Sequence, residues 1–211
     1  MEEILDIVLR SVYISGVASF LAFLVGFFLV LKAVDLRFKE FILSVFEALI
    51  GVPTTVIGLL IYLLIFPRGP LGTLNLLYTP YAIILGEFLV ALPVVFSTLY
   101  RPVENALKDL RELVISLGGN IEETTWLILR ELLPSLVSSF LMGFSRAIGE
   151  LGVALIVGGN IAGSTRVLTT TIALMTSMGE YETAVLLGLT LVSLVLIISI
   201  ALKLMGELRW K

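Results

Sequence analysis

Two residues of opposite charge lie with helical spacing inside an apolar part of the sequence, the stretch 132–157. Arg146 and Glu150 are four residues apart, so on a helix they share one face and can form an ion pair. If the stretch crosses a bilayer, an unpaired charge near its centre would cost about 2.5 kcal/mol or more. The pair therefore has two interpretations. It is either a structural ion pair that fixes helix packing, or it holds a cation, Arg146, that meets an anion in a path.

The segment 157–171, VGGNIAGSTRVLTTT, combines glycines, hydroxyl groups and a single cation. Glycine-rich turns expose backbone N–H groups and hydroxyls donate hydrogen bonds, and both suit a tetrahedral dianion. We expect an outer gate or entrance here, and an ordinary loop with a short capped helix is the alternative. With the charged pair, the candidate path or gate residues are Arg146, Glu150, Gly158, Gly159, Asn160, Arg166, Thr169 and Thr170.

The elements that must position these residues are set by composition. The chain has 211 residues, of which 58% are hydrophobic and 15% charged, and its mean hydropathy is +1.09. Soluble domains have about 25% charged residues, so this is an integral membrane protein. Cysteine and histidine are absent, which excludes disulfides and thiolate metal sites and makes a membrane enzyme a weak hypothesis. No basic patch free of the membrane indicates nucleic-acid binding.

Five apolar stretches are long enough to cross about 30 Å of hydrocarbon as helices. They are 8–31, 41–66, 80–100, 132–157 and 181–202, and together they predict one all-α transmembrane domain over 1–211. The apolar segment 167–179 is too short for a sixth span and suits a re-entrant or interfacial helix. Pro53 and Pro93 lie within spans and could supply gating bends.

Orientation follows from the basic residues. With the N-terminus outside and the C-terminus in the cytoplasm, ten Lys and Arg residues lie inside and only Arg10, Arg68 and Arg166 lie outside. Two acidic residues within spans, Glu47 and Glu87, are costly against lipid. We therefore expect them to point into the protein, to pair or to sit near an interface, in structural roles.

Between the third and fourth spans, the stretch 110–134 carries six charges, and its apolar residues recur at helical spacing on both sides of a Gly-Gly-Asn break. It predicts helix, turn, helix, with Asn120 capping the second helix, along the inner face of the membrane. A simple amphipathic connector is the alternative. Neither spacing nor composition chooses between them.

The same stretch resembles the cytoplasmic loop of type I ABC-importer permeases, whose pattern begins E-A-A-x-x-x-G. Glu112 and Gly118 match that pattern, Leu113 and Val114 replace the two alanines, and Pro134 comes three residues later than the pattern places its proline. Four further segments are similar to the tungstate-type permeases, relatives of the molybdate and sulfate permeases. These are GVPTTVIGLLIYLLI from Gly51, GPLG from Gly69, ALPVV from Ala91 and FSRAIGELGVALIVGGNIAGSTRVLTTTIAL from Phe144.

This resemblance implies a homodimeric permease subunit in the cell membrane, surrounded by lipid, that transports an oxyanion, most consistent with tungstate. An external binding protein would deliver the anion, and two copies of a separate ATPase would engage the loop 104–131, the coupling loop. The residues implied for that contact are Glu112, Leu117, Gly118, Gly119, Asn120 and Ile121.

The sequence contains no G-x-x-x-x-G-K-[ST] phosphate loop, so ATP would be used by the partner, and no cofactor is expected in this chain. Molybdate or sulfate remain alternative substrates. The alternative of another class is a secondary anion carrier or channel without an ATPase, in which neutralising Glu87 or Glu150 would abolish transport.

Overall fold

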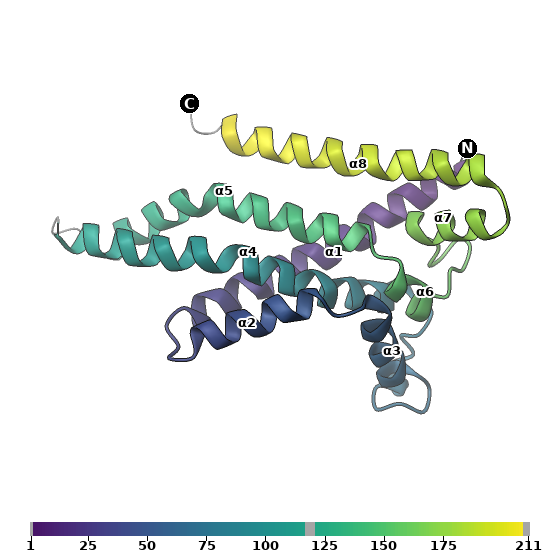
Figure 1. The fold of residues 1–211 in the computed structure, drawn as a ribbon, viewed down its shortest axis with the longest axis horizontal. Coiled ribbons are helices and arrows are strands. Elements are labelled where there is room, and N and C mark those ends of the chain that lie inside the picture. The colour runs from purple at the N-terminus through teal and green to yellow at the C-terminus, as the bar shows by residue number, and fades with distance from the viewer. Residues whose placement is uncertain (1, 117–120, 209–211) are drawn as a thin grey trace.

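The computed structural model describes residues 2–116 and 121–208, and within them the side chains of 4–109 and 130–204. Every regular element in these ranges is helical, which confirms the predicted all-α class (Figure 1). The elements are α1 (Glu2–Ala33), α2 (Lys39–Ile50), α3 (Thr54–Ile65), the short 3₁₀ helix η1 (Gly72–Leu74), α4 (Pro80–Ser116), α5 (Ile121–Ile148), α6 (Gly152–Gly158), α7 (Leu168–Ser177) and α8 (Tyr181–Leu208).

Three of these helices, α1, α4 and α8, are each long and apolar enough to cross a membrane. Two bent pairs meet the same criterion together: α2 with α3, bent by 96°, and α5 with α6, bent by 57°. Within the described residues, counting each bent pair as one span gives five spans, and counting neither gives three. The chain is therefore a multi-pass membrane protein.

The second predicted span, 41–66, is not a straight helix. It is divided at Gly51, Val52 and Pro53, where the chain turns from α2 into α3. Proline has no N–H to donate and disfavours helical geometry at the residue before it, so α2 cannot continue through this point. Pro93, in contrast, lies within the continuous helix α4.

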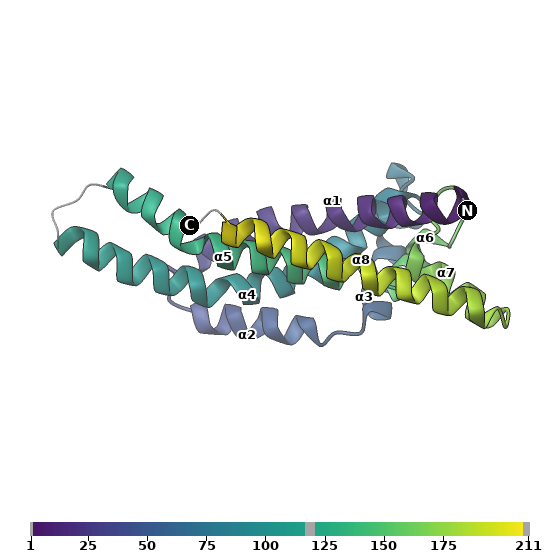
Figure 2. The same ribbon diagram turned by 90° about the horizontal axis from the view of Figure 1, so that it is seen from above.

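The third span and the start of the fourth are longer than predicted. We expected separate helices along the inner membrane face, but α4 continues beyond residue 100 to Ser116, and α5 begins at Ile121. The 37 residues of α4 correspond to about 55 Å, more than the thickness of the hydrocarbon. Good helix formers such as Leu, Lys, Arg and Glu dominate 101–116, which explains why α4 does not end at the membrane surface. The two helices extend beyond the others at the end opposite α7 (Figures 1 and 2).

The centre of the fold is α4, which packs against α1, α5, α2 and α6. The face of α1 that carries small residues packs here within the chain. Ser15, Ala18, Ser19 and Ala22 are buried, and a Cβ added to Gly26 would lie 2.8 Å from Val95 Cγ1 of α4. Small residues let helices approach closely, and dispersion then stabilises the contact where lipid supplies no hydrophobic driving force.

Helix α7 is the observed form of segment 167–179. Its ten residues correspond to about 15 Å, too short to cross the membrane. Leu168, Thr169, Thr170 and Thr171 are buried against the rest of the chain, and α7 packs mainly on α8.

Candidate functional site

The charged pair predicted for the stretch 132–157 lies at the junction between α5 and α6. Arg146 is in the last turn of α5, and Glu150 follows in the non-helical segment 149–151, which we call the α5–α6 break. Arg146 Nη1 lies 2.9 Å from Glu150 Oε2, so the pair expected from the i, i+4 spacing is present. Because the Glu150 side chain is 2% exposed and that of Arg146 is 32% exposed, the carboxylate is buried and the cation reaches the surface.

Both oxygens of the Glu150 carboxylate have partners. Oε2 pairs with Arg146, and Oε1 accepts a hydrogen bond of 3.2 Å from the N–H of Val153, in the first turn of α6. The backbone carbonyl of Glu150 accepts a hydrogen bond of 2.8 Å from the Thr169 hydroxyl of α7. A charge with this many partners is stabilised in a medium of low dielectric constant. Glu150 therefore joins α5, α6 and α7 at one point.

Arg146 faces a groove of about 520 Å³ between α4, α5 and α8. The groove is lined mainly by apolar side chains, with Ser145 of α5 and Ser199 of α8 as its hydroxyl groups. A guanidinium has five N–H donors, so an arginine that pairs with one carboxylate oxygen retains donors for another anion. The arrangement can bind an anion while Glu150 offsets part of the attraction.

The segment 158–167, which we call the 158–167 loop, is closed by hydrogen bonds of its own side chains. The Thr165 hydroxyl donates to the Gly158 carbonyl at 2.6 Å and accepts from the Ile161 N–H at 2.9 Å. Gly159 has φ of +70° and ends α6, and a Cβ there would lie 2.7 Å from the ring of Tyr78. Asn160 also has a positive φ, of +51°. These residues shape the loop.

Thr170, one of the candidate gate residues, forms local hydrogen bonds with the backbone of Val167 through its hydroxyl. Its oxygen accepts from the Val167 N–H at 3.0 Å and donates to the Val167 carbonyl at 3.0 Å, which caps α7. The hydroxyls of Thr165, Thr169 and Thr170 are buried and engaged in this structure. The structure thus brings Arg146, Glu150 and Thr169 together and places the glycines, Asn160 and Arg166 in the neighbouring 158–167 loop.

Two residues of α1 that the sequence analysis did not select hold this loop. Arg10 Nη1 donates to the Arg166 carbonyl at 2.9 Å, and Ser11 Oγ accepts from the Leu168 N–H at 2.8 Å. The sequence does contain a signal for Ser11. Ser11, Ser15 and Ser19 recur every four residues in an apolar run, and all three are buried.

Glu87 of α4 points into the protein, as expected, with 2% of its surface exposed. Its carboxyl interacts with Ser15 of α1 and lies within electrostatic reach of Glu150. Glu47 instead lies exposed on α2. Among the residues that the structure describes, no group of three or more acidic, histidine or cysteine side chains could hold a metal ion.

Helices α4 and α5 pack against each other as the α4–α5 hairpin, and the residues expected to contact an ATPase belong to the part of the sequence where α4 ends and α5 begins. Leu117, Gly118, Gly119 and Asn120 fall outside the described residues, as do the side chains of Glu112 and Ile121. The backbone places Glu112 in the last turns of α4 and Ile121 at the start of α5. A helix therefore lies on each side of the Gly-Gly-Asn segment, as predicted.

A scan of protein-family models finds none that matches this chain. Individual proteins, however, are similar to it over most of its length. A tungstate uptake system permease protein, TupB, of Peptoclostridium acidaminophilum is 37% identical over 90% of this chain and 84% of its own length. A probable anion ABC transporter permease protein of Haloferax volcanii is 40% identical over 77% of this chain and 72% of its own.

The TupB protein of Campylobacter jejuni is 37% identical over 75% of this chain and 66% of its own length. More distant relatives are named as sulfate and molybdenum transport system permeases. The first two similarities each cover more than two thirds of both chains at over 30% identity. This chain therefore belongs to the family of ABC transporter permeases that includes the tungstate uptake permeases.

Proposed function

We propose that this chain is the permease subunit of an ABC importer and forms the membrane path for tungstate. The observation that carries the proposal is a partly exposed cation, Arg146, in the lining of a mainly apolar groove beside the α5–α6 break. The substrate is taken from the names of two relatives, both tungstate uptake system permeases. Tungstate is a dianion, so a cation on its path lowers the electrostatic barrier to entering the membrane.

The pairing of Arg146 with Glu150 favours passage of the anion over tight binding. An unpaired arginine in an apolar groove would bind a dianion tightly and release it slowly. Glu150, at 2.9 Å, offsets part of that attraction and takes the guanidinium back when the anion leaves. Arg146 has no feature that distinguishes tungstate from molybdate or sulfate, which are also tetrahedral dianions. We therefore assign selectivity mainly to the binding protein that delivers the anion.

In this proposal two copies of the chain, each a single transmembrane domain, form a homodimer with the path along its axis. The N-terminus is outside, so the 158–167 loop lies outside and receives the anion, and the α4–α5 hairpin projects into the cytoplasm. Two ATPase subunits contact the hairpin through Glu112, Leu117, Gly118, Gly119, Asn120 and Ile121. ATP is used by those subunits, and their different affinities for the inward-open and outward-open states drive alternating access.

The first test uses the absence of cysteine. A unique cysteine at Asn120 carries a photocrosslinker, and we expect it to capture an ATP-binding subunit in native membranes. Gly118→Trp should abolish that capture, whereas Gly188→Trp on α8, where an added Cβ meets open space, is a control that should not. Labelling from the cytoplasmic side without capture of any ATPase would contradict the proposal.

The second test is tungstate uptake into liposomes that contain the permease, its ATPase and the binding protein. We expect uptake only with ATP, and competition experiments with molybdate and sulfate define the substrate. Uptake that proceeds without the ATPase and disappears in Glu87→Gln would instead support a secondary carrier.

A further inference from the structure

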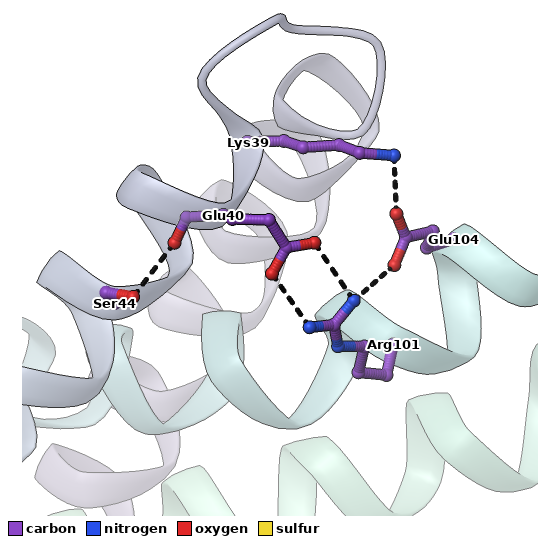
Figure 3. Close-up of polar contacts among 5 residues, drawn as sticks. All are labelled: Lys39, Glu40, Ser44, Arg101 and Glu104. Carbon is purple, nitrogen blue, oxygen red and sulfur yellow. Dashed lines mark hydrogen bonds and ion pairs between the residues drawn. The ribbon is translucent and has the colours of Figure 1, made fainter.

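A cluster of four charged residues connects the start of α2 to α4. Its basic members contributed to the predicted orientation of the chain in the membrane and have had no other role so far. The ion cluster consists of Lys39, Glu40, Arg101 and Glu104 (Figure 3). Arg101 binds both oxygens of Glu40, at 2.8 and 3.1 Å, and also binds Glu104 at 2.8 Å. Lys39 Nζ lies 2.6 Å from the other oxygen of Glu104. Each helix therefore contributes one cation and one anion.

Below the ion cluster, α2 is attached to α4 by apolar packing. The rings of Phe46 and Phe96 stack with centroids 3.9 Å apart, and Leu43 is buried in the same contact. Elsewhere α2 is largely exposed, for example at Phe41 and Leu49, because its main packing partner is α4. The position of α2 thus depends on α4.

At its other end the same segment contacts the candidate site. Helix α3, which follows α2 after the 96° bend, packs mainly against α6. The approach is close: a Cβ on Gly58 would lie 3.2 Å from Val153 Cα, and one on Gly152 would lie 2.9 Å from Thr54 Oγ1. Val153 is the residue whose N–H binds Glu150. The α2–α3 segment therefore contacts α4 at one end, at Arg101 and Glu104, and α6 at the other end, beside the α5–α6 break.

We propose that the ion cluster makes the α2–α3 segment move together with α4, so that movement of the α4–α5 hairpin reaches α6 and the Arg146–Glu150 pair. Arg101 is the positioning residue, because it alone contacts both helices through two carboxylates. The inference rests on the proposed function, in which ATPase subunits act on the hairpin. Exposed ion pairs add little to stability. A bidentate arginine in a network nevertheless fixes the geometry of two helices.

The experiment measures tungstate imported per ATP hydrolysed in liposomes that contain the whole transporter. Arg101→Glu places an anion opposite Glu40 and Glu104, and we expect the ratio to fall by about tenfold, within the range of coupling between neighbouring charges. Arg37→Glu makes the same change in charge at an exposed position of the α1–α2 turn, outside the ion cluster, and should leave the ratio unchanged.

A rescue variant separates a positioning role from misfolding. Glu40→Arg with Arg101→Glu and Glu104→Gln restores a cation on α2 opposite an anion on α4, and we expect most of the lost ratio to return. Spin labels at Val45 of α2 and Lys108 of α4, both exposed, report the separation of the helices. We expect one distance in the wild-type transporter with and without ATP, and a broad distribution in Arg101→Glu.

The outcomes distinguish the two proposals. If the wild-type transporter shows no ATP-dependent uptake, the proposed function fails, and this inference with it. If the wild type imports tungstate and Arg101→Glu imports as much per ATP, the function stands and the inference is overturned. A rescue variant that folds but does not recover the ratio also overturns it.

Discussion

Arginine–glutamate pairs hold two regions of this molecule, and the pairs differ in exposure. At the α5–α6 break the Glu150 side chain is 2% exposed, whereas in the ion cluster Glu40 is 60% and Arg101 55% exposed. Breaking a buried pair leaves a charge that water cannot solvate, while exposed pairs contribute about 0–1 kcal/mol. We therefore expect the first pair to contribute more to stability, and the second to act mainly on which helices move together.

The largest effect is expected for Glu150→Gln. The substitution leaves Arg146 without its counter-charge, and we expect the free energy of unfolding to fall by about 2–3 kcal/mol, below the range for fully buried pairs because Arg146 is partly exposed. Denaturant unfolding in lipid nanodiscs measures it. The double variant with Arg146→Gln removes both charges and should be more stable than the single one. A single variant as stable as the wild type would contradict this view of the break.

Gly152→Ala tests the close packing of α3 against α6 beside the α5–α6 break. The added Cβ would lie 2.9 Å from Thr54 Oγ1 and 3.1 Å from the Thr55 backbone nitrogen, so α3 and α6 must separate. We expect a loss of about 1–3 kcal/mol, as for other overpacked sites. Gly188→Ala, which has open space on α8, is the matched control and should be neutral. Equal thermal stability of the two variants would show that α3 and α6 tolerate separation.

Ser11→Ala addresses the contact between α1 and α7. It leaves the Leu168 N–H without its 2.8 Å partner in a buried position, and we expect a loss of about 1–2 kcal/mol. Hydrogen exchange at the start of α7 should accelerate. Thr190→Ala on α8, whose exposed hydroxyl bonds only its own helix, serves as the comparison. Unchanged exchange in Ser11→Ala would mean that α7 is held by packing alone.

The smallest effect on stability is expected for Arg101→Gln. Both pairs of Arg101 are at least partly exposed, so the free energy of unfolding should change by no more than about 1 kcal/mol. The tungstate-to-ATP ratio should nevertheless fall. A large loss of stability would show that the ion cluster stabilises the fold as the Arg146–Glu150 pair is expected to do, and would contradict the difference drawn between the two regions.

Hydropathy and local spacing predict the features that depend on neighbouring residues. The length of apolar runs locates the helices because bilayer thickness fixes it. The Arg146–Glu150 pair follows from a separation of four residues on one helix. The Gly-Gly-Asn segment is flanked by helices, as its composition indicates. In each case the information lies within one continuous stretch of the chain.

Contacts between distant segments could not be predicted in this way. Ser11 meets Leu168 across 157 positions, and Arg101 meets Glu40 across 61. No periodicity in a single sequence relates such positions. The extension of α4 beyond residue 100 was missed for another reason: hydropathy detects where lipid ends, whereas the helix ends only where backbone hydrogen bonding is interrupted.

The low burial of α8 has a consequence for how the protein is made. Only 6% of the residues in the apolar part of α8 are buried, against 56% for α4, although α8 is the more apolar of the two helices. Insertion of α8 into the bilayer therefore requires no tertiary contact, whereas α4 is surrounded mainly by other helices of the chain. Biogenesis then follows two stages, in which independently inserted helices such as α8 exist first and the bundle around α4 assembles afterwards.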